Sequence, residues 1–392
     1  MKAIILAAGR GTRLQPLTNT IPKPMIQVCW KPILEYLMES IYSDVSEIIL
    51  IVKYKKEIIK EYFWDKFNNT KISYITQWEE KGTGWALKGI DLDDHVLILN
   101  GDSIIDSKDI KQLIQSHTGW MLVESVNNPE IYGVCKVDKS NNVQKIIEKP
   151  NEFVWNLVSL WAFKFSPDIF RLIQNLELSS RWEYEITDAV NNYVKENVFQ
   201  AIEISWDFID IWYPWDILTA NSHFLNKLEQ SEIKWTVEDW VTIKWNIVLE
   251  EWAILKSWTY IEWNCYIGKN SSIGPHTYLR WETVIWQDCK IWNAVEVKNS
   301  CFWDKVSIAH LSYIWDSIMW NNINIGWWFI AAPLRNDDKN IRVMVQNKLV
   351  DTGKRKFWVI VWDNVKTAIN TSTMPGRRID TWVMTMPWEI VK

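Results

Sequence analysis

The sequence predicts an α/β domain with a mostly parallel sheet, followed by a second domain made of a stacked β-repeat. Three observations predict this organisation. Short apolar runs alternate with helical patterns over residues 1–220, an aliphatic residue recurs at every sixth position from residue 237, and a polar stretch separates the two regions. A chain of 392 residues suits two or three domains. We therefore expect a first domain at 1–222, a linker at 223–236 and a second domain at 237–392.

The first domain is expected to alternate strands with helices. Pro32–Ser43 has helical spacing and is followed directly by a β-rich run. This alternation is typical of a parallel sheet that helices cover on both faces, and such sheets bind ligands beyond the carboxyl ends of their strands. A glycine-rich turn follows the first strand and Gly101-Asp102 follows the third, so we expect the site there. The predicted strands are Lys2–Ala7, Glu47–Val52 and His95–Leu99.

The second domain carries a strict six-residue repeat. A helix repeats at about 3.6 residues and a strand at about 2, so a period of six indicates a stacked coil with three faces, each pointing an aliphatic side chain inward. A helix and a polar linker at 217–235 precede it, residues 298–334 continue it less regularly, and turn residues return over Lys356–Glu389. The residues in register are Val237, Ile243, Leu249, Leu255, Ile261, Ile267, Ile273, Leu279, Ile285, Ile291 and Val297.

Composition argues against several functional classes. Apolar residues make up 48% and charged residues 23%, so the chain can bury large cores. The net charge is −5 and the pI about 5.7, which disfavours general nucleic-acid binding. No apolar run approaches the roughly 18–20 residues of a membrane span, and the short run before Arg10 does not predict a secretory signal. We therefore expect no nucleic-acid or membrane partner.

The cysteines predict a reducing environment. They are odd in number, are scattered along the chain and form no C-x-x-C pair, which argues against a zinc site or a disulfide framework. We expect buried free thiols and a cytoplasmic location. The five are Cys29, Cys135, Cys265, Cys289 and Cys301.

Tryptophan is unusually frequent and glycine unusually rare. The chain has 29 Trp and 13 Gly, and many tryptophans follow polar turn residues, as in Lys244-Trp245 and Glu262-Trp263. Tight turns need positive φ, which glycine adopts freely and a bulky residue adopts only with strain. Our hypothesis is that most of these codons are UGA, read as glycine in the source bacterium, with Trp215 a true tryptophan. The alternative is a genuinely tryptophan-rich protein, and the codons of the gene decide between the two.

The string LAAGRGTRLQPLTNTIPKPM, residues 6–25, predicts a phosphate-binding turn. Gly9 and Gly11 leave backbone N–H groups exposed where a phosphate chain can lie. Arg13 supplies a planar charged fork for phosphate oxygens and Lys23 a point charge. Leu14 stands where a dinucleotide fingerprint has its third glycine, and no Gly-Lys-Ser/Thr occurs, so neither the dinucleotide motif nor a P-loop fits.

This string resembles the signature of the sugar-1-phosphate nucleotidylyltransferases, and the resemblance continues in order across the first domain. Where that family has glycine, this chain has Trp30, Trp85, Trp161, Trp182 and Trp212, a one-directional departure that a misread codon would produce. A true Trp85 would crowd the base pocket, and a true Trp212 would crowd the metal. The other matching segments are Gln77, Lys81-Gly82-Thr83-Gly84, Asn100-Gly101-Asp102, Tyr132-Gly133, Glu148-Lys149-Pro150, Asn156, Trp182-Glu183 and Phe208–Asp216.

The resemblance implies a Rossmann-like mixed sheet and a Mg²⁺-dependent reaction. A sugar-1-phosphate oxygen attacks the α-phosphorus of a nucleoside triphosphate, and because both are anions, positioning and charge neutralisation do most of the catalysis. Asp102 and Asp210 are expected to hold Mg²⁺, and Arg13 and Lys23 to steady the α-phosphate and the pyrophosphate. The expected nucleotide contacts are Leu6, Ala8, Gly9, Gly11, Thr12, Gln77, Gly82 and Thr83. The expected sugar-phosphate contacts are Gly133, Glu148, Lys149 and Asn156.

The six-residue repeat resembles the left-handed β-helix of hexapeptide acyltransferases. Residues 291–326 are most similar to the acetyltransferase half of bifunctional N-acetylglucosamine-1-phosphate uridylyltransferases. The resemblance implies acetyl-CoA as co-substrate and His310 as the general base that deprotonates the sugar amine, with Lys298, Tyr313 and Asn324 on the sugar phosphate. Pro333 stands where that family commonly has an asparagine, so one sugar contact is lost, while Lys339 remains as a positive charge.

Three functions stay open. The first is a nucleotidylyltransferase with a second, acetyl-transfer activity. The second has only the nucleotidyl transfer, to glucose- or mannose-1-phosphate, with the β-helix as an assembly scaffold. The third is a non-catalytic regulatory subunit that binds sugar nucleotides, which is disfavoured because the arginine, lysines and aspartates named above are all present. The resemblance favours UTP or dTTP and a homotrimer.

Overall fold

The computed structural model describes residues 1–116, 119–205, 208–332 and 334–392. These residues form two compact units. The first unit contains Met1–Arg10, Ile21–Ile26 and Pro32–Asp210, and the second contains Gly11–Thr20, Gln27–Lys31 and Ile211–Lys392.

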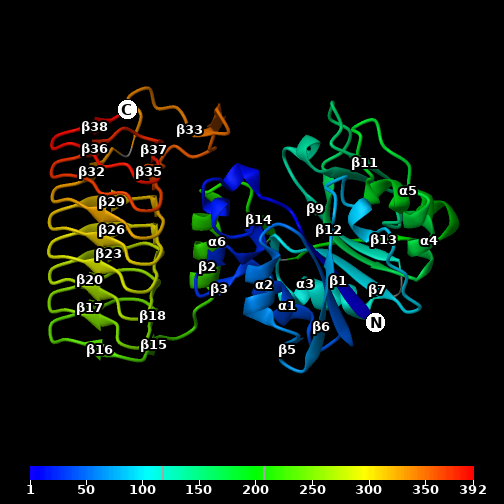
Figure 1. The fold of residues 1–392 in the computed structure, drawn as a ribbon, viewed down its shortest axis with the longest axis horizontal. Coiled ribbons are helices and arrows are strands. Elements are labelled where there is room, and N and C mark those ends of the chain that lie inside the picture. The colour runs from blue at the N-terminus through cyan, green and yellow to red at the C-terminus, as the bar shows by residue number, and fades with distance from the viewer. Residues whose placement is uncertain (117–118, 206–207, 333) are drawn as a thin grey trace. The chain divides into compact units, whose positions relative to one another are not determined.

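The first unit is built on a ten-stranded mixed sheet (Figure 1). Its centre is the parallel set β7, β1, β4 and β6, and the antiparallel strands β5 and β12 flank this set. The order is β11-β10-β12-β7-β1-β4-β6-β5, with β9 and β13 branching from β12. The strands are β1 Lys2–Ala7, β4 Glu47–Val52, β5 Lys66–Phe67, β6 Thr70–Thr76, β7 Val96–Asn100, β9 Trp120–Ser125, β10 Gly133–Val137, β11 Val143–Glu148, β12 Leu157–Phe165 and β13 Gln200–Glu203.

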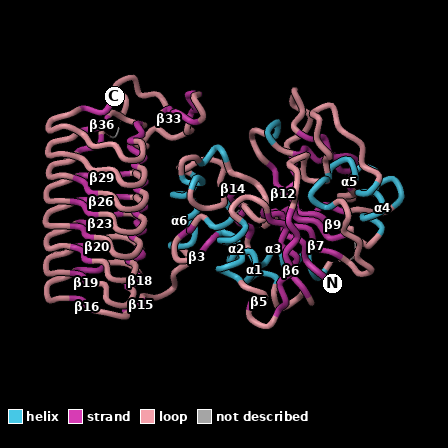
Figure 2. The backbone as a smooth tube through the Cα atoms, in the orientation of Figure 1, coloured by secondary structure: helices cyan, strands magenta, loops and turns pink. Residues whose placement is uncertain are grey.

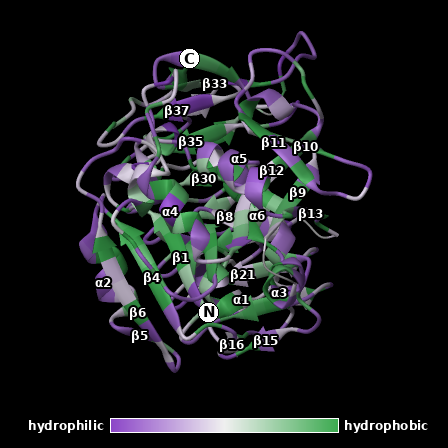
Figure 3. Cartoon of the chain, turned by 90° about the vertical axis from the view of Figure 1, so that its right-hand side faces the viewer, coloured by the Kyte–Doolittle hydropathy of each residue, from purple (hydrophilic) through white to green (hydrophobic). Residues whose placement is uncertain are grey.

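Helices cover both faces of this sheet. The face of the sheet that contains Ile5 packs against α1, α2 and α3. The opposite face, which contains Ile4, packs against α4 and α5. Strands β1 and β4 are mostly buried and largely green in Figure 3 because both faces are covered. The predicted α/β fold is confirmed. The helices of this unit are α1 Ile33–Ile41, α2 Lys56–Phe63, α3 Ser107–Gln115, α4 Asp168–Gln174 and α5 Ile186–Glu196, with short 3₁₀ turns at Lys23–Met25, Trp85–Leu87 and Pro129–Ile131. The 3₁₀ turns Thr12–Leu14 and Leu17–Asn19 belong to the second unit.

The second unit is a three-faced parallel β-helix preceded by α6, Asp216–Leu225 (Figures 1 and 2). Each strand pairs in parallel with the strand one coil later, as Ile247 does with Cys265. The first sheet contains β15 Glu232–Ile233, β18 Ile247–Leu249, β21 Cys265–Ile267, β24 Thr283–Ile285, β27 Cys301–Phe302, β30 Ile318–Met319, β35 Val359–Val361 and β37 Arg377–Ile379. The second contains β16 Thr236–Val237, β19 Ile254–Leu255, β22 Ser272–Ile273, β25 Lys290–Ile291, β28 Ser307–Ile308 and β31 Asn324–Ile325. The third contains β17 Thr242–Ile243, β20 Tyr260–Ile261, β23 Tyr278–Arg280, β26 Glu296–Lys298, β29 Tyr313–Trp315, β32 Ile330–Ala331, β36 Ser372–Thr373 and β38 Ile390–Val391.

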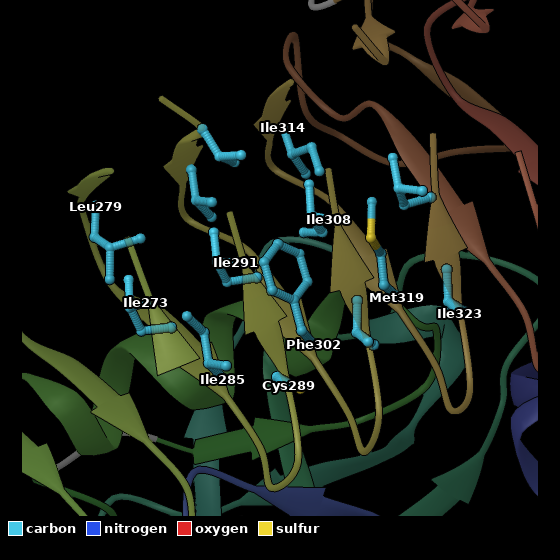
Figure 4. Close-up of a cluster of buried hydrophobic side chains, with 14 of the residues drawn as sticks. Ile273, Leu279, Ile285, Cys289, Ile291, Phe302, Ile308, Ile314, Met319 and Ile323 are labelled. Atoms are coloured by element: carbon cyan, nitrogen blue, oxygen red, sulfur yellow. The ribbon is translucent and has the colours of Figure 1, made fainter. Parts of the chain in front are cut away.

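The six-residue repeat fills the centre of the coil, as predicted. Figure 4 shows Ile273, Leu279, Ile285 and Ile291 projecting into one continuous apolar interior. Each of these four side chains is at most 1% exposed. Val237, the first member of the repeat, is 37% exposed. The repeat therefore predicts the core of the second unit from its second coil onward.

Several short elements were not predicted. An antiparallel hairpin, β33 and β34, interrupts the coil after β32. A two-residue ribbon, β2 with β3, and a three-residue ribbon, β8 with β14, complete the described strands of the chain. Their bounds are β2 Gln27–Val28, β3 Lys31–Pro32, β8 Ser103–Ile105, β14 Phe208–Asp210, β33 Arg342–Val345 and β34 Lys348–Asp351.

The backbone at many tryptophans is left-handed, which agrees with the glycine hypothesis. Trp64 has φ 55° and ψ −141°, a region that essentially only glycine occupies. The indole N–H groups of Trp286, Trp320, Trp358 and Trp362 are buried with no acceptor among the described residues, at a cost of about 1–3 kcal/mol each. The described tryptophans at positive φ are Trp64, Trp161, Trp182, Trp240, Trp252, Trp258, Trp281, Trp328, Trp382 and Trp388.

Two further expectations concern cysteines and membrane spans. All five cysteines are free and buried, which confirms the prediction of free thiols. Within the described ranges, no helix combines the length and the hydrophobicity that crossing a bilayer requires.

Glu47 joins three neighbouring strands and should make stability depend on pH. Its carboxylate accepts from Lys2 on β1 at 2.8 Å, from Lys71 on β6 at 2.7 Å and from Ser73, and these bonds lower its pKa from 4.5 to about 2. The stabilisation is therefore present above pH 4.5 and is lost as pH falls toward 2. We expect Glu47→Gln to lower the free energy of unfolding by about 2 kcal/mol at pH 7 and to flatten its decline below pH 4.5.

Urea unfolding at pH 7 and at acid pH measures this effect. Glu57→Gln, at an exposed position of α2, is the control and should stay near wild type. An equal loss of stability at both pH values would contradict the role given to the Glu47 charge.

Candidate functional site

Asp102 is held at the carboxyl end of β7 by a close turn. Gly101 donates its N–H to the carbonyl of Leu6 on β1 at 2.9 Å. A Cβ at position 101 would lie 2.9 Å from that oxygen and 3.0 Å from Ile5, closer than packed atoms allow. Glycine is therefore required here, and the turn places Asp102 at the edge where the expected ligand site lies.

Asp210 reaches the same place through the ribbon of β8 with β14. In this antiparallel pair Asp210 lies opposite Ser103, the residue that follows Asp102. The ribbon thus brings together two carboxylates that are far apart in sequence. Both aspartates are partly buried, with side chains 25% and 13% exposed.

Lys23 joins the two aspartates. Its Nζ lies 2.7 Å from Oδ2 of Asp102 and 3.2 Å from Oδ1 of Asp210, and its side chain is 10% exposed. Burial lowers the pKa of Lys23, but the charges and hydrogen bonds of the two aspartates outweigh burial and the net pKa is raised. Three of the predicted residues thus form one cluster in the first unit.

The cluster fits a divalent cation. Oδ1 of Asp102 is buried and has no hydrogen-bond partner among the described residues, so one carboxylate oxygen remains for a ligand. Two carboxylates against one ammonium leave a net negative charge. Within the described part of the chain, no group of three or more His, Cys, Asp or Glu side chains could hold a metal. A two-carboxylate set suits Mg²⁺, which keeps waters and phosphate oxygens as further ligands.

The expected nucleotide contacts of the first unit lie mostly at the same edge of the sheet. Leu6 is on β1, with Ala8 and Gly9 directly after that strand. Gln77 follows β6 and donates its N–H to the carbonyl of Val52 at the end of β4. Because β1, β4, β6 and β7 run parallel, these positions lie along one edge with Asp102.

Gly82 and Thr83 belong to a loop that is bonded to Tyr184. The N–H of Tyr184 donates to Lys81 O at 2.7 Å, and the N–H of Gly84 donates to Tyr184 O at 2.8 Å. Gly82 has φ 96°, and a Cβ there would lie 2.6 Å from Tyr184 O. Glycine at position 82 therefore allows both the positive φ of this loop and its close approach to the backbone of Tyr184.

The expected sugar-phosphate contacts are only partly grouped. Gly133 lies opposite Glu148 in the pairing of β10 with β11, and Lys149 follows directly. Glu148 is 11% exposed, with Arg181 at 3.7 Å and Lys149 at 4.0 Å. Burial, and secondarily Glu185, raises the pKa of Glu148. Asn156 is exposed, directly before β12.

Gly11, Thr12 and Arg13 belong to the second unit. Gly11 has φ 60°, and its carbonyl accepts from the Thr18 hydroxyl at 3.0 Å. The Arg13 guanidinium lies 4.7 Å from the centre of the Trp212 ring. A glycine at position 212 would remove this stacking contact and leave the guanidinium fork open.

Lys298 and Tyr313 lie on adjacent strands of the third sheet of the β-helix. Tyr313 pairs with Glu296, and Glu296 stands two residues before Lys298 on β26. Lys298 is 2% exposed, its Nζ 3.8 Å from Asp316 and 3.4 Å from the ring centre of Trp281. Burial lowers its pKa.

His310 and Asn324 lie elsewhere on the coil. His310 is exposed in the turn between β28 and β29, with its ring 5.7 Å from that of Trp292. Asn324 is exposed on β31, which belongs to the second sheet, so one copy of the chain does not place it beside Tyr313. Pro333 lies outside the described residues, and the expectation of a lost sugar contact there stays a prediction.

A comparison with family models decides the family. The model described as Nucleotidyl transferase matches residues 2–227, which contain all the site residues of the first domain. The chain belongs to the nucleotidyl transferase family. It is therefore an enzyme of nucleotidyl transfer.

Two relatives of this nucleotidyl transferase match nearly its whole length, and a third matches about half of it. It is 43% identical over 381 residues to the bifunctional protein GlmU of Methanocaldococcus jannaschii, covering 97% of this chain and 92% of the relative. It is 38% identical over 394 residues to a bifunctional sugar-1-phosphate nucleotidylyltransferase/acetyltransferase of Sulfurisphaera tokodaii, covering 100% and 97%. It is also 35% identical over 226 residues to the UTP–glucose-1-phosphate uridylyltransferase AglF of Haloferax volcanii, covering 55% and 93%.

Solved structures support the fold. A UDP-glucose pyrophosphorylase complexed with UDP-glucose aligns with a TM-score of 0.52 at 23% identity, covering 58% of this chain and 99% of that chain. A putative glucose-1-phosphate thymidylyltransferase from Bacillus anthracis aligns with a TM-score of 0.52 at 24% identity, covering 59% and 98%.

Sequence reasoning did not identify two charged residues near Lys298 in this nucleotidyl transferase, Arg280 and Glu296. Arg280 pairs with Lys298 on the adjacent strand, and its guanidinium lies 3.1 Å from Glu296. The six-residue period could have predicted this pairing, because three repeats make one coil and Arg280 therefore stands one coil before Lys298.

Proposed function

We propose that the chain transfers a nucleotidyl group from UTP or dTTP to a sugar-1-phosphate and releases pyrophosphate. The observation that carries this proposal is the cluster of Lys23 with Asp102 and Asp210 at the carboxyl edge of the parallel strands. Two carboxylates that would hold Mg²⁺, with a lysine beside them, suit the neutralisation of two reacting anions. The named activity of the Haloferax volcanii relative favours UTP.

The charge of each side chain determines its proposed role. Asp102 and Asp210 would hold Mg²⁺, which when bound neutralises phosphate charge. Lys23 and Arg13 bind the α-phosphate and the departing pyrophosphate, while Lys149 holds the sugar phosphate and Glu148 accepts from a sugar hydroxyl. A sugar-phosphate oxygen forms the new bond to the α-phosphorus as the bond to pyrophosphate breaks. The remaining nucleotide contacts are Leu6, Ala8, Gly9, Gly11, Thr12, Gln77, Gly82 and Thr83, and Gly133 and Asn156 complete the sugar site.

Pyrophosphate release tests this activity. We expect release from UTP or dTTP with glucose-1-phosphate or N-acetylglucosamine-1-phosphate when Mg²⁺ is present, and none after chelation with EDTA. Binding of a sugar nucleotide without any release would instead identify a regulatory subunit.

We propose acetyl transfer from acetyl-CoA to an amino-sugar-1-phosphate as a second activity, in residues 237–392. It is supported by the adjacency of Lys298 and Tyr313, the exposed His310 and the bifunctional relatives. His310 takes the proton of the amine, whose nitrogen forms the amide as the thioester bond breaks. Residues 223–236 would connect this domain to the catalytic domain at 1–222. Asn324 on a different sheet suits a homotrimer, and five free buried cysteines suit the cytoplasm.

Thiol release from acetyl-CoA with glucosamine-1-phosphate or galactosamine-1-phosphate tests the second activity. We expect His310→Gln to reduce it by about 10²–10⁴-fold while leaving pyrophosphate release unchanged. His276→Gln is the matched control, because His276 is also a coil-turn histidine. Wild-type protein without thiol release would favour the β-helix as an assembly scaffold.

A further inference from the structure

Lys23 reaches the two aspartates from a fixed backbone. It begins the 3₁₀ turn Lys23–Met25, which Pro24 constrains, and Met25 donates its N–H to the carbonyl of Pro22 at 2.9 Å. Met25 is 5% exposed and packs in the core with α1. The side chain of Lys23, with its four rotatable methylenes, is therefore the part that can move.

The ammonium group stands where a bound cation would stand. Mg²⁺ lies about 2.0–2.1 Å from its oxygen ligands. An ion bound to the two oxygens that Lys23 contacts, at 2.7 Å and 3.2 Å from Nζ, would occupy the space of the ammonium and carry the same sign of charge. The two cations therefore exclude each other at these oxygens.

The lysine leaves the aspartates incompletely neutralised. One positive charge faces two negative ones, and Oδ1 of Asp102 is buried without a partner among the described residues. A divalent ion can neutralise both carboxylates and also use this oxygen. The Lys23 ammonium therefore occupies the site in the absence of metal, and a divalent ion, which carries more charge, can replace it.

We propose that Lys23 is a built-in counter-ion of the metal-free enzyme, and that Mg²⁺ displaces its ammonium from Asp102 and Asp210. This inference rests on the proposed metal role of these aspartates. The displaced ammonium needs a new anionic partner, which the triphosphate supplies. The metal and the nucleotide therefore bind more tightly together than separately, and Lys23 becomes available to phosphate only after the metal has bound.

Mn²⁺ binding to the nucleotide-free, full-length protein is the first test, with free Mn²⁺ measured by electron paramagnetic resonance. Lys23→Met should bind Mn²⁺ at least about tenfold more tightly than wild type, and Asp210→Asn should bind it more weakly. Equal Kd values for wild type and Lys23→Met would overturn the displacement. An Asp210→Asn variant that binds as wild type does would instead remove the metal role itself, and with it the proposed mechanism.

Amine labelling of wild-type protein is the second test, because it separates displacement from a simple change of charge and needs no folded variant. We expect Mg²⁺ to increase acylation of Lys23 severalfold, as read by peptide mass spectrometry. Lys164 is the internal control, since its buried Nζ donates to Ile114 O at 2.7 Å and should label equally with and without Mg²⁺. Unchanged labelling of Lys23 would overturn the proposal even if Lys23→Met tightened Mn²⁺ binding.

Discussion

Replacing Asp210 by asparagine is expected to slow pyrophosphate release by about 10³-fold or more at saturating Mg²⁺ and substrates. The amide keeps the size of the side chain but removes one of the two charges that the cluster presents. Lys23 keeps its 2.7 Å contact with Asp102, so the buried ammonium remains paired and the fold should survive. The rate is measured by coupled detection of pyrophosphate, and folding by the thermal unfolding midpoint.

Asp168→Asn is the matched control for this substitution. Asp168 is an exposed residue in the first turn of α4, in the same unit, and its replacement should leave the rate within about twofold of wild type. If Asp210→Asn also kept nearly full activity, the reaction would not depend on the negative charge of Asp210.

Replacing Trp64 by glycine is expected to raise the free energy of unfolding by about 1–2 kcal/mol. Trp64 directly follows α2, at φ 55° and ψ −141°, and is 73% exposed, so the substitution relieves strain and removes little buried surface. Urea denaturation followed by circular dichroism measures the change. Substituting all the described positive-φ tryptophans together should give a larger gain, because their strain is distributed over separate turns.

Trp78→Gly separates backbone strain from the loss of an exposed indole. Trp78 is 86% exposed and does not have positive φ, so glycine there should give no gain and a loss of up to about 1 kcal/mol. Peptide mass spectrometry of the protein from its source organism tests the codon hypothesis directly. Tryptophan at most of the positive-φ positions in that protein would end the hypothesis of UGA read as glycine.

The spacing of apolar residues predicted much of the architecture, because this spacing reflects which side chains are buried in each strand and helix. The six-residue spacing gave the interior of the β-helix because every coil repeats the same environment. Val237 departs from it, because a first coil has no earlier coil to cover it. The hairpin of β33 and β34 escaped prediction because it is an insertion with no period of its own.

The cluster of Lys23, Asp102 and Asp210 was predictable only through resemblance. β8 and β14 are three residues long and lie far apart in sequence, and strands so short show no recognisable alternation. Nothing local therefore predicts that Asp210 pairs beside Asp102. The close turn at Gly101 was predictable in position, but the contact of that glycine with Leu6 depends on strand order, which is a tertiary property.

The β8–β14 ribbon also has a consequence for synthesis on the ribosome. Because β14 supplies the second carboxylate, a nascent chain cannot assemble the acidic pair until residue 210 has left the exit tunnel, long after β1, β4 and β7 can associate. Until then Lys23 has only one of its two anionic partners. Affinity for divalent ions should therefore appear late during translation, as a step rather than a gradual rise.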